Sequence, residues 1–179
     1  MEAYVDYMVV KSNYEADRLD NLRETFDTLC KYKMKLNPMK YVFTVSLGKF
    51  LGFMVSQRGI EANPDKIKAI MEIKSPKMVK EVQSLIGKVN ALNKFISRAI
   101  NKCLPFFKVL KKAFQWTNEC KEALTKLKNY LTQPPLLSLS IMGEKMHLYL
   151  AVSNTEVSLA LIREDEDVQR PVYYTSHAF

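Results

Sequence analysis

Residues 50–64 read Phe-Leu-Gly-Phe-Met-Val-Ser-Gln-Arg-Gly-Ile-Glu-Ala-Asn-Pro and carry the clearest local signals in the chain. The apolar run Lys49–Val55 predicts a strand, and Gln57-Arg58-Gly59 predicts a turn that returns the chain through Ile60. Asn63-Pro64 opens a helix, because proline suits the first helical position. The stretch therefore predicts a strand, a turn, a returning segment and a helix, in that order.

Helical and strand patterns alternate on both sides of this stretch. A capping box of Ser12 and Glu15 predicts the start of a helix that Asn37-Pro38 ends. The helical patterns that follow Pro64 occupy residues 79–95, 103–112 and 117–132. Strand patterns occupy Ala3–Val10 (a hairpin around Asp6), Tyr41–Val45, Met146–Val152, Ser158–Arg163 and Pro171–Thr175. This order predicts the α+β fold class, with two sheet-containing units flanking a helical block.

Composition excludes several classes of protein. Of the 179 residues 47% are hydrophobic and 26% charged, as in ordinary globular domains. No window of 18 apolar residues is present, so no membrane-spanning helix is expected and no membrane partner is predicted. The three cysteines, Cys30, Cys103 and Cys120, are widely spaced and form no Cys-x-x-Cys pair. They favour reduced thiols, and the sequence predicts an intracellular protein without a signal peptide.

The positive charge is concentrated in the middle of the chain. The net charge is +8, and residues 61–130 alone carry 15 basic and 6 acidic side chains. A polyanion such as nucleic acid would neutralise such a block and release condensed counterions. A set of solvated, lysine-rich helix faces explains the charge equally well. Lysine outnumbers arginine 21 to 6, which suits contact with phosphates more than the reading of base edges.

Several motifs occur in the order found in reverse transcriptases. Tyr4-Val5-Asp6-Tyr7 resembles the Tyr-x-Asp-Asp hairpin of the polymerase palm, and residues 35–43 are similar to the family's Leu-Asn-x-x-Lys-Cys-x-Phe segment. Residues 50–56 resemble its Phe-Leu-Gly primer-grip hairpin, and residues 63–67 resemble the start of its thumb. Residues 104–137 are similar to the joint into the RNase H region of gypsy-like LTR retrotransposons, of plant type. The resemblance covers nearly the whole chain.

This resemblance implies a domain organisation. Residues 1–62 would be the C-terminal part of the palm with the primer-grip hairpin, and residues 63–112 the helical thumb. Residues 113–179 would be a connecting helix with the first strands of an incomplete RNase H-like domain. The fingers and the other catalytic aspartate would precede Met1, and the remaining RNase H acids would follow Phe179.

Two departures from the family pattern bear on catalysis. Nucleotidyl transfer uses two divalent metals held by carboxylates, so by resemblance Asp6 would be a catalytic residue and a Mg²⁺ ligand. The second aspartate of the motif is Tyr7 here, and a phenol is neutral at pH 7 and a poor ligand for a hard cation. In the first RNase H strand, Ala151 stands where an active nuclease has aspartate. Glu156 falls on a predicted turn, as a solvated acid. The acidic run Glu164–Asp167 is interpreted as a solvated hairpin loop.

The nucleic-acid-binding candidates fall into two sets. By resemblance Phe50, Leu51 and Gly52 would approach the primer end, although a place in the strand core is an equal alternative for Phe50. Lysines around the apolar stripe of the thumb helices could contact phosphates, namely Lys66, Lys68, Lys74, Lys77 and Lys80. Lys108, Lys111 and Lys112 form a second cluster. Each lysine taken singly is better explained as a solvated side chain, whereas the set taken together fits a thumb that grips a duplex.

The sequence thus predicts a fragment of a retrotransposon Pol polyprotein, an RNA-directed DNA polymerase joined to RNase H, that is catalytically inactive by itself. Its partners would be an RNA/DNA primer–template duplex and the rest of the polyprotein. One alternative is a non-catalytic module that binds primer–template duplex. Another is a polymerase subunit that supplies its thumb in trans.

Overall fold

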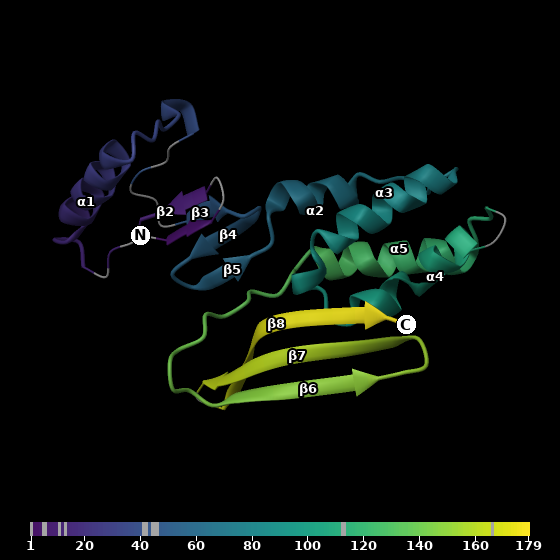
Figure 1. Ribbon diagram of the computed structural model, residues 1–179. Helices are drawn as coiled ribbons and strands as arrows, with labels where there is room; N and C mark the ends of the chain where they lie inside the picture. Colours follow the sequence, from purple (N-terminus) through teal and green to yellow (C-terminus); the bar gives the residue numbers. More distant parts are fainter. Residues whose placement is uncertain are drawn as a thin grey trace. The chain divides into compact units, whose positions relative to one another are not determined.

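A computed structural model of the chain describes residues 2–4, 7–10, 12, 14–40, 43, 47–111, 114–165 and 167–179. It separates into two compact units, Met1–Gly52 and Phe53–Phe179. The elements are drawn in Figure 1. They confirm the predicted mixture of helices and small antiparallel sheets. No helix in the described ranges is long and apolar enough to cross a membrane.

The first unit contains a hairpin and a single long helix. Strands β1 (Glu2–Tyr4) and β2 (Tyr7–Val9) pair antiparallel with Tyr4 opposite Tyr7, as the predicted hairpin requires. Helix α1 spans Arg18–Lys31, a short 3₁₀ turn η1 spans Pro38–Lys40, and strand β3 spans Leu47–Phe50.

The predicted boundaries of α1 are wrong at both ends. Asp17, not Ser12, is the N-cap residue. The Ser12 hydroxyl instead accepts a hydrogen bond of 2.8 Å from the side-chain amide of Asn21. The helix ends well before Pro38 because Lys33 adopts a positive φ of 54°. The next amide, on Met34, then donates back to the Leu29 carbonyl, which closes the last turn.

The second unit begins with the hairpin and helix predicted from residues 53–71. Strands β4 (Phe53–Ser56) and β5 (Gly59–Glu61) pair antiparallel with Ser56 opposite Gly59. Helix α2 (Pro64–Met71) begins with the Asn63 side chain accepting the Asp65 amide at 2.9 Å. The predicted strand Lys49–Val55 is wrong in one respect. It is interrupted at Leu51 and Gly52, which have positive φ values of 50° and 77°.

Three more helices follow α2. Helix α3 spans Val79–Asn90, a 3₁₀ turn η2 spans Asn93–Phe95, helix α4 spans Ala99–Lys111, and helix α5 spans Asn118–Leu131. The predicted helix over residues 79–95 therefore ends five residues early and continues as η2. The predicted start of α5 is confirmed, because the Thr117 hydroxyl accepts the Cys120 amide.

A three-stranded antiparallel meander completes the second unit. It consists of β6 (Met146–Val152), β7 (Glu156–Asp165) and β8 (Val168–Ala178), in that spatial order. Strand β8 packs against η2 and α4, whereas β6 lies at an edge of the sheet. Six of the seven β6 residues are exposed, because no described helix covers this strand.

The core of the second unit lies among the helices. Its largest fully buried side chains are Phe95, Phe106, Ile70, Leu85, Leu92, Ile96, Leu127 and Leu131. Full burial of each such side chain contributes about 1.5–3 kcal/mol relative to exposure. Residues of α2, α3, α4 and α5 share this one core, so these helices are held together by a common apolar cluster.

A backbone contact joins the β4–β5 hairpin to the segment after α5. The Ile60 amide donates to the Leu137 carbonyl at 2.8 Å, and the Leu137 amide donates to the Ile60 carbonyl at 3.0 Å. Gly59, at a φ of 139°, makes room for this pairing. A Cβ at that position would lie 2.1 Å from the Leu137 oxygen.

We expect Gly59→Ala to destabilise the chain by at least about 2 kcal/mol, because it adds both a disfavoured φ and a clash with backbone. Gly87→Ala is the matched control. Gly87 is helical and open space surrounds its missing Cβ, so alanine should stabilise by about 0.4–1 kcal/mol. Urea unfolding followed by circular dichroism measures both changes. Equal stabilities for the two variants would show that the Ile60–Leu137 pairing does not need glycine.

Candidate nucleic-acid interface

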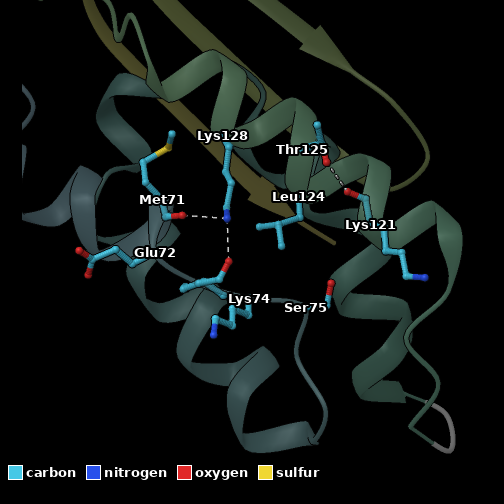
Figure 2. A pocket seen from close by; sticks show the side chains of 9 residues that line it. Met71, Glu72, Lys74, Ser75, Lys121, Leu124, Thr125 and Lys128 are labelled. Atoms are coloured by element: carbon cyan, nitrogen blue, oxygen red, sulfur yellow. Dashed lines mark hydrogen bonds between the residues drawn. The ribbon is translucent and has the colours of Figure 1, made fainter.

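A basic hollow lies between the end of α2 and helix α5. It has a volume of about 470 Å³ and is lined by Met71, Glu72, Ile73, Lys74, Ser75, Lys121, Leu124, Thr125 and Lys128. Figure 2 shows Lys128 reaching from α5 toward the backbone that follows α2. A second hollow of about 360 Å³ shares Ile73, Lys74 and Ser75, and adds Lys77, Glu81, Ser84 and Lys88. The segment between α2 and α3 thus contributes to both hollows.

Two of these lysines hold the C-terminus of α2. The Lys128 ammonium donates to the Met71 carbonyl at 2.9 Å and to the Ile73 carbonyl at 2.7 Å. The Lys88 ammonium donates to the Ala69 carbonyl at 3.3 Å. The last carbonyls of a helix lack intrahelical partners and carry partial negative charge, so a cation here is stabilising. Lys88 and Lys128 therefore have a structural role.

Three other lysines around the hollows can still bind an anion, because no described carboxylate neutralises them. Lys74, Lys77 and Lys121 are exposed, and none pairs with a carboxylate in the described part of the chain. The Lys77 backbone amide donates to the Glu81 carboxylate at 2.6 Å, which fixes the start of α3 beside the second hollow. Exposed ammonium groups that line a hollow can contact phosphates.

The five thumb lysines predicted from the sequence are placed in different surroundings. Lys74 and Lys77 line the hollows, and Lys80 is exposed on α3. Lys68 pairs with Glu72 at 3.8 Å, and Lys66 lies over the Phe53 ring. Their role in binding nucleic acid stays a prediction. The sequence reasoning missed Lys121 and Lys128, although their seven-residue separation places them on one face of α5.

Other lysines of the basic block have local partners. Lys108, from the second predicted cluster, forms an ion pair of 3.0 Å with Glu119. Lys111 is exposed, and Lys112 lies outside the described residues. Lys102 is half-buried 4.6 Å over the Tyr130 ring and donates to the Ser97 carbonyl and hydroxyl. Burial lowers the pKa of Lys102, and the nearby Arg98 charge lowers it further.

The predicted primer-grip residues occupy the end of the first unit and its turn. Phe50 ends β3 and is half-buried, and Leu51 and Gly52 follow with positive φ. A positive φ is common for glycine but unusual for leucine, so Leu51 does not favour this turn by its own conformational preference. The contact of these three residues with a primer end stays a prediction.

The residues predicted to matter for metal chemistry are described only in part, so the metal-ligand role of Asp6 stays a prediction. Asp6 lies outside the described residues, and only the backbone of Tyr7 is described, in β2. Ala151 is exposed on β6, opposite Ser158, and its methyl group offers no ligand oxygen. Within the ranges described, no three acidic, histidine or cysteine side chains lie close enough to hold an ion. The residues around Ala151 therefore do not fit a Mg²⁺ site.

Glu156 has a different role from the solvated turn acid predicted. It begins β7, is only 3% exposed, and its carboxylate accepts the Asn101 amide at 2.8 Å. The Ser176 hydroxyl on β8 accepts the neighbouring Ile100 amide at 3.2 Å. Both amides belong to the first turn of α4, which lacks intrahelical acceptors. The sheet thus caps α4, and sequence reasoning could not see this because the partners lie 55 and 76 residues apart.

The acidic run lies at the β7–β8 hairpin, as predicted, and two of its exposed carboxylates also contact side chains of neighbouring strands. Glu164 lies 2.9 Å from His147, across the sheet on β6. Asp165 lies 3.5 Å from Arg170 on β8. The carboxylates therefore pair with neighbouring strands and do not converge on a metal.

The comparisons with known proteins agree with this architecture. Residues 116–179 match the model of the family described as RNase H-like domain found in reverse transcriptase. The transposon Tf2-7 and Tf2-3 polyproteins of Schizosaccharomyces pombe are each 28% identical to 176 residues, which is 97% of this chain and 13% of each polyprotein.

Solved structures show the same fold. A foamy viral protease-reverse transcriptase in complex with RNA/DNA hybrid matches with a TM-score of 0.81 at 22% identity, covering 94% of this chain and 23% of that one. The same protein in complex with dsDNA matches with a TM-score of 0.80, covering 36% of that chain. The fold is therefore an α+β fragment of the reverse transcriptase–RNase H type.

Over 97% of its length the chain is similar to these transposon polyproteins, and over residues 116–179 it matches the RNase H-like family model. It spans about an eighth of the length of the curated relatives that it matches.

Replacing Glu156 tests the cap on α4. We expect Glu156→Ala to destabilise by about 1–2 kcal/mol, because the Asn101 backbone amide in the first turn of α4 loses its acceptor. Glu156→Gln should cost less, since its amide oxygen can still accept. Glu122→Ala, at an exposed position of α5, should stay within about 0.5 kcal/mol of the parent. Chemical denaturation measures all three, and a Glu156→Ala stability equal to that of Glu122→Ala would contradict the capping role.

Proposed function

We propose that the helical segment of this chain binds the backbone of a primer–template duplex. The observation that carries the proposal is a group of exposed lysines around the two hollows, none of which pairs with a carboxylate among the described residues: Lys74, Lys77 and Lys121. Lysine ammonium groups contact phosphates as point charges and gain affinity by counterion release. The foamy viral structures in complex with RNA/DNA hybrid and with dsDNA support this choice of ligand.

The chain would contribute binding without catalysis of its own. Tyr7 places a neutral phenol in the palm motif, and Ala151 removes the oxygen ligand from the first RNase H strand. By resemblance to reverse transcriptases, Mg²⁺ would supply the chemistry of nucleotidyl transfer, and Asp6 of this chain would be one of its ligands. Within the palm motif, Asp6 is followed by Tyr7, so the motif offers one carboxylate where two metal ions need several.

The proposal also concerns the longer protein to which the chain would belong. It would act as one segment of a longer Pol polyprotein inside the cell, with the remaining segments as its partners. The motifs quoted above favour a gypsy-like element of plant type. They also favour division at residues 62/63 and 112/113 into palm, thumb and RNase H-like parts.

Charge removal at the hollows tests the binding proposal. We expect the triple variant Lys74→Ala, Lys77→Ala, Lys121→Ala to flatten the slope of log affinity against log salt by about 2.7, at roughly 0.9 per phosphate contact on duplex DNA. The control, Lys35→Ala, Lys126→Ala, Lys145→Ala, removes the same charge from exposed positions elsewhere. Fluorescence anisotropy with a labelled primer–template duplex measures both slopes. If the two triple variants have the same slope, the hollows are not the binding surface.

A graft tests the loss of catalysis at the palm motif. The hairpin segment is placed in a complete related polymerase, once with Tyr7 and once with Tyr7→Asp. The Tyr7 graft should extend primers at least about a hundredfold more slowly, on the order of 3 kcal/mol in barrier, because a metal ligand is missing. Single-turnover primer extension measures this, and equal rates would show that Asp6 suffices.

A further inference from the structure

A second cationic cluster shares no residue with the lining of the hollows and contains two lysines that lie over aromatic rings. The Lys66 ammonium of α2 lies 5.3 Å from the centroid of the Phe53 ring, and the Lys94 ammonium of η2 lies 5.2 Å from the same centroid. Lys94 also lies 5.8 Å from the ring centroid of Tyr173 on β8. The cluster therefore joins the β4 hairpin, a thumb helix, η2 and the RNase H-like sheet.

The backbone position of Lys94 is fixed by the packing of its neighbour, Phe95. Phe95 is fully buried and packs against Phe53 with ring centroids 5.7 Å apart. The Phe95 carbonyl also accepts the Tyr130 hydroxyl at 2.8 Å. Lys94 directly precedes this anchored residue on the short η2 turn, so it stays exposed while its neighbour is buried. The position of Lys94 follows from the core.

The charges of Lys66 and Lys94 are not neutralised by the aromatic rings that they contact. Lys68 and Lys108 are paired with carboxylates, and Lys88 and Lys128 are bound to helix carbonyls. Lys66 and Lys94 form no ion pair with a described carboxylate and are attracted to ring faces instead. A ring face orients an ammonium group without neutralising it.

The spacing of the two ammonium groups suits a nucleic-acid strand. Because both lie about 5 Å from one centroid, they are at most 10.5 Å apart. Each strand of a duplex carries one negative charge per about 3.4 Å of helix axis, so neighbouring phosphates can engage both. An anion between them also relieves the mutual repulsion of two like charges.

We propose that Lys66 and Lys94, oriented by Phe53 and Tyr173, form a phosphate-binding subsite for one strand of the bound nucleic acid. This inference rests on the proposed function, since it names a further contact with the same ligand. Of its residues, only Lys66 was a candidate from the sequence. Phe53, Lys94 and Tyr173 are brought together by the fold from three separate elements.

The test compares charge removal with charge retention at Lys94, an exposed residue. Lys94→Gln should reduce the slope of log affinity against log salt by about 0.9 and weaken binding of a labelled primer–template duplex about eightfold at 0.1 M salt. Lys94→Arg should retain the parent slope, because it keeps the cation. The control Lys126→Gln removes the same charge from an exposed position on α5 and should leave the slope unchanged.

The outcomes separate this inference from the proposed function. If the parent chain shows no salt-dependent affinity for duplex, the proposed function itself fails. If the parent binds and the triple variant at the hollows lowers the slope, but Lys94→Gln matches Lys126→Gln, only the subsite is overturned. A loss for Lys94→Arg as large as for Lys94→Gln would also overturn it. Circular dichroism melts of each variant establish that the fold is retained.

Discussion

The pairing of Ile60 with Leu137 is the constraint on which the second unit depends. Two backbone hydrogen bonds join residues 77 positions apart and fix the β4–β5 hairpin against the segment that leads from α5 into the sheet. Once the hairpin is fixed, Phe53 can pack on Phe95, and α2 starts at a defined place through Asn63. The whole arrangement requires a residue without a side chain at position 59. One glycine thereby determines where helix α2 begins.

The lysines of this chain differ in what holds each ammonium group, and this determines what each can do. Some bind helix carbonyls and some pair with carboxylates, and those charges are already compensated. Others lie over aromatic rings or are exposed, and they still attract an anion. Net charge alone therefore overstates the binding surface. Only the structure shows which members of a basic block remain uncompensated.

Much of the fold could be predicted where the signals are local. Asn63-Pro64 and Thr117 start helices as predicted, and the strand Met146–Val152 has the predicted ends. The predictions failed where distant residues decide. The Ser12 hydroxyl accepts a hydrogen bond from the Asn21 side chain and does not cap α1. Leu51 adopts a positive φ, which nothing in the local sequence predicts because leucine rarely adopts it. Glu156 is a cap because the fold brings it to Asn101. In the candidate interface, the sequence identified Lys74 and Lys77 but not Lys121 and Lys128, the two α5 lysines that line the first hollow.

Binding and catalysis place separate demands on a chain of this kind. Metal-dependent phosphoryl transfer requires several carboxylates converging within a few ångströms, so the loss of one ligand damages the whole centre. Contact with a phosphate backbone is a sum of separate ammonium–phosphate interactions, and it survives the loss of any acid. Neutral residues at Tyr7 and Ala151, where the resemblance implies aspartates, leave every lysine of the helical block in place. They also carry no negative charge that would oppose a polyanion. Contact with a duplex backbone therefore does not depend on acids at these two positions.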